Sequence, residues 1–220
     1  MNKLALFDCD GTLVDSQANI CLAMEHSFDR AGLVPPTRAA TRRIVGLSLV
    51  EAMRVLLPDA DAALHLALAE DYKAAFHRLR GNGLVDEPLF EGIAEAIETL
   101  DQAGWMLGVA TGKSDRGLRL CLAHHGLAHR FITLQTADRH PSKPHPSMAE
   151  LAMVEAGAAP ETTVMIGDTS FDMAMAVAAG SHALGVAWGY HPPEELTLAG
   201  AHRVAATPAS LPGYLEEMLG

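Results

Sequence analysis

One stretch near the start of the chain decides its fold class: Leu4-Ala5-Leu6-Phe7-Asp8-Cys9-Asp10-Gly11-Thr12. The four apolar residues are typical of a parallel strand that helices cover on both faces. Two acids follow at the carboxyl end of this strand, where open α/β sheets bind their ligands, and Gly11 permits a sharp turn there. We expect Asp8 and Asp10 to face a common site and Cys9 to point away. A strand that merely ends in two solvated acids would show the same residues.

Further apolar runs of strand length recur at residues 105–110, 131–134, 163–166 and 183–186. Helical stretches lie between them and end at a glycine, the favoured residue just past a helix C-terminus. These stretches are residues 93–103, 114–125, 147–156 and 171–179, and a last helix is expected at 211–219. Strands that alternate with helices predict an α/β fold, with a Rossmann-like parallel sheet between two layers of helices.

Residues 15–83 break this alternation, because they show helical periodicity and no strand pattern. The expected helices run from Ser16 to Ala31, from Thr37, and from Asp59 or Asp61. This pattern predicts an all-helical cap domain at residues 15–83, inserted into a core domain of residues 1–14 and 84–220. The hinges are expected near Asp15 and Gly81-Asn82-Gly83.

The composition excludes several classes of protein. The formal net charge of −11 repels nucleic acid backbones and anionic membranes. The three cysteines, Cys9, Cys21 and Cys121, form no Cys-x-x-Cys pair, so neither a disulfide framework nor a zinc knuckle is expected. The N-terminal apolar run is too short for a signal peptide, and no apolar run reaches the ~20 residues of a membrane span. We therefore expect a cytoplasmic protein without nucleic acid or membrane partners.

Three distant segments complement the first strand. Thr111 and Gly112 end the second strand and offer a hydroxyl and a backbone N–H at a helix N-terminus, an arrangement that binds anions. Lys143 lies in a loop that two prolines stiffen. Asp168 and Asp172 follow the fourth strand, four residues apart. Each segment alone is equally consistent with a solvated loop, but together they predict one site at the strand ends.

The ordered set Asp8-x-Asp10-Gly11-Thr12, Thr111, Lys143 and Gly167-Asp168-x-x-x-Asp172 resembles the four motifs of the haloacid dehalogenase superfamily. The resemblance covers the whole chain and is nearest to phosphoglycolate phosphatase-like members with a helical cap after the first strand. It implies the α/β core of that superfamily with an inserted helical cap domain. It also implies a Mg²⁺-dependent phosphatase that hydrolyses a small phosphorylated metabolite through an aspartyl-phosphate.

The resemblance also assigns roles to the acids. Asp8 is the nucleophile, a role that a carboxylate can fill, and its side chain binds the metal. Asp10 binds the metal through its backbone carbonyl, while its side chain acts as general acid and base. Asp168 completes the Mg²⁺ site, and Asp172 has an indirect role beside it.

The remaining motif residues are expected to bind the phosphoryl group. Thr111 and the Gly112 N–H contact its oxygens, and Lys143 balances the charge between Asp8 and the phosphate. Arginines of the cap segment are candidates for substrate contacts, although a solvated helix face explains each of them better. They are Arg42, Arg43, Arg78 and Arg80.

Several alternatives stay open. A β-phosphoglucomutase-like phosphomutase resembles Asp-x-Asp-Gly-Val and carries an arginine after the cap turn, where this chain has Thr12 and Leu49. A pyrophosphatase of the same superfamily shares all four motifs. A non-catalytic receiver-like module also uses an Asp, a Thr and a Lys, but it lacks an inserted helical domain. A P-loop is excluded, because it needs four residues between its glycines and only three separate Gly108 from Gly112. The sequence leaves the phosphorylated substrate and the oligomeric state open.

Overall fold

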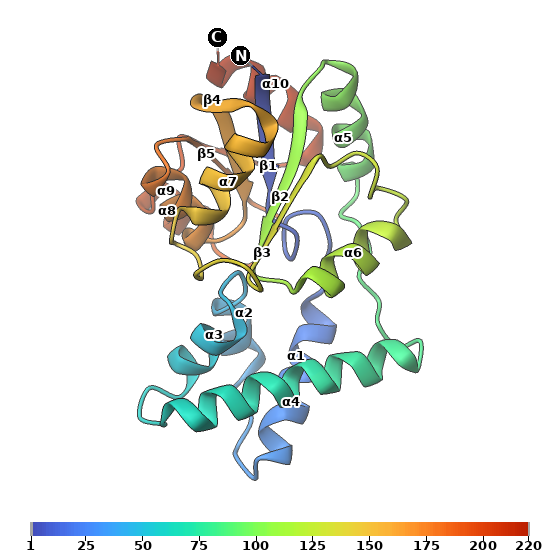
Figure 1. Ribbon diagram of the computed structural model, residues 1–220, viewed down its shortest axis with the longest axis vertical. Helices are drawn as coiled ribbons and strands as arrows, with labels where there is room; N and C mark the ends of the chain where they lie inside the picture. Colours follow the sequence, from blue (N-terminus) through green and yellow to red (C-terminus); the bar gives the residue numbers. More distant parts are fainter. Residues whose placement is uncertain (1, 220) are drawn as a thin grey trace.

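The structure, a computed structural model, describes residues 2–219. Within these residues, six parallel strands form one sheet in the order β3-β2-β1-β4-β5-β6 (Figure 1). The strands are β1 (Asn2–Phe7), β2 (Met106–Thr111), β3 (Thr133–Thr136), β4 (Ala158–Gly167), β5 (His182–Val186) and β6 (Arg203–Ala205). Since β1 pairs with both β2 and β4, its carboxyl end lies in the middle of the sheet edge.

Helices cover both faces of the sheet and complete three layers (Figure 1). One face carries α5 (Ile93–Gln102), α6 (Asp115–His124) and α10 (Leu211–Leu219), which a short 3-10 turn (Pro208–Ser210) precedes. The other carries α7 (Ser147–Ala156), α8 (Ser170–Ala178) and α9 (Pro193–Leu198). Along β1, Ala5 and Phe7 pack into the first core, whereas Leu4 and Leu6 pack into the second. This burial on both faces explains why β1 is apolar throughout.

The predicted α/β class and parallel sheet are confirmed, and the five predicted strands correspond to β1–β5. The sequence patterns miss β6 and α9. β6 has three residues, of which only Ala205 is buried, and α9 has six residues. Elements this short do not span enough residues for a hydrophobic period to show.

Between β1 and α5 the chain forms four helices, which we call the helical unit (Figure 1). They are α1 (Gln17–Arg30), α2 (Arg38–Arg43), α3 (Leu49–Leu56) and α4 (Ala62–Gly81). The unit has its own hydrophobic core, around the fully buried side chains of Phe28, Met53 and Leu68. The division of the chain into a cap domain at residues 15–83 and a core domain stays a prediction.

The helical unit differs in two details from the sequence expectation. The helix that Thr37 begins ends at Arg43, and the turn that separates α2 from α3 contains Gly46, whose φ of +98° favours glycine. Ser16 precedes α1 as expected but makes no side-chain capping bond. Its hydroxyl donates to Asp10 instead, because the loop after β1 brings that carboxylate within reach. Asp61 does cap α4, accepting a hydrogen bond of 2.8 Å from the Leu64 N–H.

The helical unit lies against the carboxyl edge of the sheet, and both chain ends lie at the opposite edge (Figure 1). The Ser48 N–H donates to Ser142 Oγ at 2.8 Å, which joins the turn before α3 to the loop of Lys143. Arg43 forms an exposed ion pair of 2.7 Å with Glu195. These contacts close the unit over the strand ends.

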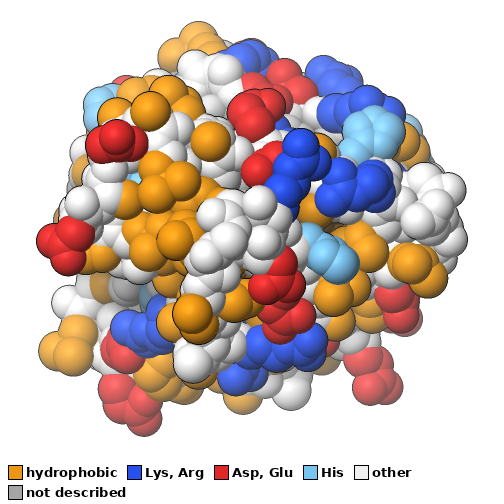
Figure 2. Space-filling model, turned by 90° about the horizontal axis from the view of Figure 1, so that it is seen from below, with side chains coloured by type: hydrophobic (Ala, Val, Ile, Leu, Met, Phe, Trp, Pro, Cys, Tyr) orange, Lys and Arg blue, Asp and Glu red, His pale blue; other side chains and the backbone are white. Residues whose placement is uncertain are grey.

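The outer end of the helical unit has a mixed surface. Figure 2 shows hydrophobic, acidic and basic side chains interspersed on this end. Between β1 and α5 the large exposed apolar side chains are Val34, Val55, Leu66 and Leu84. Among the helices of residues 2–219, none combines the length and the apolar character needed to cross a bilayer.

Candidate active site

Three buried carboxylates meet at the carboxyl edge of the sheet: Asp8, Asp168 and Asp172. One carboxylate oxygen from each lies within 4.8 Å of the other two. Asp8 follows β1, and its N–H continues the pairing with β4 by donating to the Ile166 carbonyl at 2.8 Å. Because β1 and β4 are neighbours, their ends bring Asp8 and Asp168 together, as the strand pattern predicts.

Glycines make room for Asp168. At Gly11, whose φ is +85°, an added Cβ would lie 2.2 Å from Asp168 Oδ2. At Gly189 an added Cβ would lie 2.1 Å from Asp168 Cβ. The carboxylate is fixed between them, since Oδ1 accepts from the Thr12 hydroxyl at 2.8 Å and Oδ2 from the Tyr190 N–H at 2.9 Å.

Lys143 lies between two of the acids. Its Nζ is 3.0 Å from Asp8 Oδ1 and 2.6 Å from Asp172 Oδ1, and the side chain is fully buried. Burial alone would lower the pKa of Lys143, but the charges of Asp172 and Asp8 raise it above its usual value. The lysine therefore stays charged and compensates one of the carboxylates.

Asp172 also lies in the first turn of α8. Its Oδ2 accepts from the Thr169 N–H at 3.0 Å and from the Thr169 hydroxyl at 2.7 Å, and the Asp172 N–H donates to Thr169 Oγ1 at 3.3 Å, which completes a capping box. Both of its oxygens are thus engaged, one by the helix start and one by Lys143. This fixed geometry suits the predicted indirect role of Asp172, which stays a prediction.

The residues present fit a divalent cation. Three buried carboxylates face one lysine, and Asp8 Oδ2 is a buried oxygen without a hydrogen-bond partner within residues 2–219. Without a cation, burial and then the charges of Asp172 and Asp10 raise the pKa of Asp8 to about 7, despite Lys143. Burial and the same kind of repulsion raise the pKa of Asp168. A cation with hard oxygen ligands would relieve this repulsion and occupy Oδ2.

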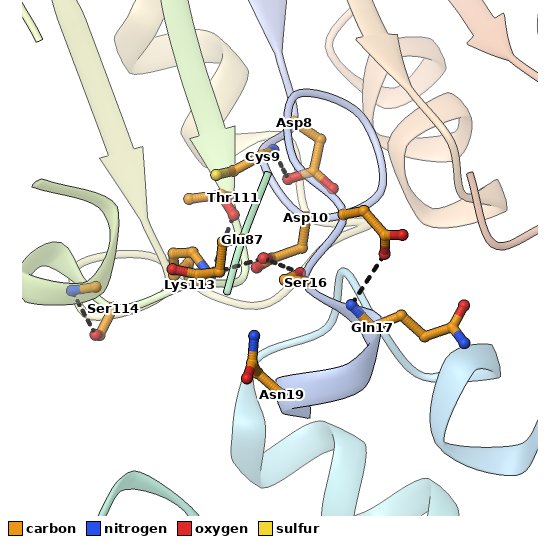
Figure 3. Close-up of polar contacts among 12 residues, drawn as sticks. Asp8, Cys9, Asp10, Ser16, Gln17, Asn19, Glu87, Thr111, Lys113 and Ser114 are labelled. Atoms are coloured by element: carbon orange, nitrogen blue, oxygen red, sulfur yellow. Dashed lines mark hydrogen bonds and ion pairs between the residues drawn. The ribbon is translucent and has the colours of Figure 1, made fainter. Parts of the chain in front are cut away.

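The Asp10 side chain points away from that of Asp8 (Figure 3). Its Oδ1 accepts from Lys113 Nζ at 2.7 Å and also from the Ser16 hydroxyl. Asp10 is therefore held apart from Asp8, which suits separate tasks for the two acids. The metal contact through the Asp10 carbonyl stays a prediction. Cys9 lies in the hydrophobic core, as the alternation along the strand predicts.

Thr111 and Gly112 lie at the end of β2, beside Asp8. Thr111 is buried, and its Oγ1 accepts from the Lys113 N–H at 3.2 Å. At Gly112 an added Cβ would lie 2.6 Å from the Leu47 carbonyl of the helical unit. Only glycine allows the unit this close to the strand end.

A cavity of about 100 Å³ lies between Asp8 and the helical unit. Its lining from the sheet side consists of Asp8, Asp10, Thr111, Gly112, Lys113, Ser114 and Gly117. Its lining from the helical unit is mainly apolar. The four candidate arginines are not among the lining residues, and Arg43 and Arg80 form ion pairs with Glu195 and Glu87.

Comparison with known proteins identifies the family. Residues 5–186 match the model of the haloacid dehalogenase-like hydrolases. The chain belongs to this family. The predicted family membership is thereby confirmed.

The hydrolase is similar to two named proteins over most of its length. It is 35% identical over 226 residues to "Probable phosphatase IndB" of Dickeya dadantii, and the alignment covers 100% of this chain and 96% of the relative. It is 30% identical over 194 residues to a "Phosphoglycolate phosphatase" of Xylella fastidiosa, with coverage of 88% and 83%. The crystal structure of a hydrolase from Pseudomonas syringae is 26% identical, with a TM-score of 0.87 and full coverage of both chains.

Sequence reasoning missed one charged residue of this hydrolase site, Lys113. Its Nζ bridges Asp10 and Glu87 Oε1, the latter at 2.9 Å (Figure 3). Glu87 also pairs with Arg80 at 2.7 Å. Burial would lower the pKa of Lys113, but Asp10 and other neighbouring acidic groups raise it. Its position directly after Thr111 and Gly112 was a usable signal. Glu87, by contrast, belongs to no sequence motif, and only the fold brings it to the site.

Gly189→Ala is expected to lower phosphate release by at least about 100-fold, since an ångström of misplacement in a site costs that much. The added methyl would displace Asp168. Steady-state rates measure the loss. Gly213→Ala is the matched control, because an added Cβ there meets nothing within 4 Å. Equal rates in both variants would show that the position of Asp168 does not matter.

Proposed function

We propose that the protein is a Mg²⁺-dependent phosphatase that hydrolyses a small phosphorylated metabolite through a phosphoaspartate on Asp8. The single observation that carries the proposal is Asp8 Oδ2, which is buried and has no hydrogen-bond partner within residues 2–219, in a residue that pairs with Lys143 and lines the cavity. Most buried carboxylate oxygens have hydrogen-bond partners, so an oxygen without one marks a reactive or ligand-binding position. The family and the named phosphatases among its relatives support the same chemistry.

Asp8, Asp168 and the Asp10 carbonyl would hold the Mg²⁺. When bound, the ion supplies positive charge that allows a carboxylate to approach a phosphate dianion. The three carboxylates carry two more charges than Lys143 neutralises, which matches a divalent ion.

Residues of the chain carry out the first half of the reaction, the transfer of the phosphoryl group to Asp8. Lys143 and the Cys9 N–H hold Asp8 Oδ1, at 3.0 and 2.7 Å, and so orient the carboxylate that attacks phosphorus. Thr111 and the Gly112 N–H bind the oxygens of the transferring group. As the Asp8–phosphorus bond forms and the ester bond breaks, Asp10 gives a proton to the leaving alcohol.

The second half of the reaction returns the enzyme to its starting state. Asp10 takes a proton from a water molecule, which attacks the phosphorus of the phosphoaspartate. Inorganic phosphate leaves, and the Asp8 carboxylate is free again. Hydrolysis is favoured over phosphomutase chemistry because Leu49, an apolar residue that lines the cavity, stands where a mutase carries an arginine.

Metal removal tests the proposal. Phosphate release from a panel of phosphorylated metabolites is expected in MgCl₂ and is expected to vanish in EDTA. Because the ion binds the folded state alone, Mg²⁺ at 100 times its Kd should stabilise the fold by about 2.7 kcal/mol, visible as a rise in Tm. Asp168→Asn should abolish both effects. Equal release in EDTA, or an unchanged Tm rise in the variant, would contradict the metal assignment.

A further inference from the structure

The cavity beside Asp8 has two unlike walls. The sheet side supplies the polar groups that would bind the phosphoryl group. The helical unit supplies an almost wholly apolar wall, made of Ile20, Met24, Ile44, Val45, Leu47, Leu49, Ala52, Tyr72 and Phe76. If the phosphoryl group lies at Asp8, this wall surrounds the leaving alcohol. Apolar walls with a few polar groups recognise ligands by shape and by those groups.

The cationic side chain among the lining residues, Lys113, is already engaged. Its Nζ lies 2.7 Å from Asp10 Oδ1 and 2.9 Å from Glu87 Oε1. It also lies 5.7 Å from the centroid of the Phe76 ring. An ammonium group has three N–H donors, and the two carboxylates accept from two of them. Among the lining residues Lys113 is the one cation, and its charge is already matched by these carboxylates.

The charges around the cavity also disfavour a second anionic group on the substrate. Lys113 and Arg80 are matched by Asp10 and Glu87, so this group of four side chains carries no excess positive charge. The Lys113, Asp10 and Glu87 side chains are largely buried. A further carboxylate placed against the apolar wall would be desolvated and unpaired, which is strongly disfavoured. Tyr72 offers a hydroxyl, which is a neutral partner, and burial raises its pKa further.

We propose that the protein acts on phosphate esters of uncharged alcohols with apolar surface, and that it rejects esters whose alcohol carries a carboxylate, such as 2-phosphoglycolate. This inference rests on the proposed function, because that function places the phosphoryl group at Asp8. It separates this chain from the substrate that the Xylella fastidiosa relative is named for.

A matched pair of substrates tests the inference. Isobutyl phosphate and 2-phosphoglycolate differ in one branched group, two methyls against two carboxylate oxygens of similar volume. We expect kcat/KM to favour isobutyl phosphate by at least about 100-fold, since a site discriminates strongly when a group is left buried and unpaired. Acetyl phosphate, which makes little contact with the apolar wall, is the third substrate.

A cation introduced into the wall should weaken the preference for isobutyl phosphate. Leu49 is half-buried at the start of α3 and lines the cavity. In Leu49→Lys we expect the kcat/KM ratio to shift towards 2-phosphoglycolate by at least about tenfold, as one compensated charge allows. Leu49→Met, which has a similar shape without the charge, is expected to keep the ratio within about twofold.

The outcomes separate the inference from the proposed function. Release from none of the three substrates, in Mg²⁺, would overturn the proposed function and the inference with it. Release from acetyl phosphate together with 2-phosphoglycolate as good as isobutyl phosphate would overturn the inference alone. So would release from acetyl phosphate only, or an equal shift of the ratio in both Leu49 variants.

Discussion

Asp8→Asn is expected to lower phosphate release by at least about 10⁴-fold while the protein stays folded. Removal of a nucleophile costs this much or more in enzymes that form a covalent intermediate. Asparagine has nearly the same shape as aspartate, and Oδ1 keeps its contacts with Lys143 and the Cys9 N–H. The loss should therefore reflect chemistry rather than a change of structure.

Thermal unfolding distinguishes the two explanations. In EDTA the substitution removes one of three mutually repelling buried carboxylates, so the Tm of Asp8→Asn should equal or exceed that of the native chain. In MgCl₂ the native chain should gain stability and the variant should gain less. Asp8→Ala serves as a second variant, because alanine cannot revert to aspartate by deamidation. Native rates in either variant would contradict the assigned role.

Lys143→Met is expected to destabilise the fold in EDTA by about 3–5 kcal/mol, which is the usual cost of breaking a buried ion pair by removing one partner. Methionine fills most of the same space but leaves Asp8 and Asp172 without their cation. Added Mg²⁺ should restore part of the stability, because it supplies charge to the same cluster. Phosphate release should fall by at least about 100-fold, as expected when one group that stabilises transition-state charge is lost.

Lys73→Met is the matched control for this substitution. Lys73 lies on α4 in an exposed ion pair of 2.8 Å with Glu70. Such surface pairs contribute less than about 1 kcal/mol. Urea denaturation of both variants, in EDTA and in MgCl₂, measures the difference. If Lys143→Met is as stable as Lys73→Met in EDTA, the acid cluster does not depend on Lys143 for its charge balance.

Much of the fold was predictable because its strands are buried on both faces. A strand such as β1 must then be apolar throughout, and a run of apolar residues between helix-ending glycines is visible without a structure. The edge strand β6 and the short helix α9 carry no such signal. Ser16 is an N-cap residue by sequence and lies at the predicted position before α1. Its hydroxyl donates to Asp10 and not to the helix, because a tertiary contact replaces the capping bond.

The candidate site also has residues that the sequence predicts and residues that it does not. Asp8, Asp168 and Lys143 follow strands or stiff loops in recognisable motifs, so their convergence could be predicted from the order of the elements. The contacts of Lys113 with Asp10 and Glu87 could not, because Glu87 meets them only when the helical unit and the core are in place. Gly189 was also out of reach, since its need for glycine comes from Asp168, which is distant in sequence.

The most direct test of the central claim is to find the phosphoryl group on the protein during turnover. The native chain is mixed with substrate and Mg²⁺, quenched in acid within one turnover, digested and analysed by mass spectrometry. We predict a phosphorylated peptide that contains Asp8, labile at alkaline pH and absent from Asp8→Asn. Turnover with the phosphoryl group on another residue, or with no phosphorylated peptide under single-turnover conditions, would contradict the proposed mechanism.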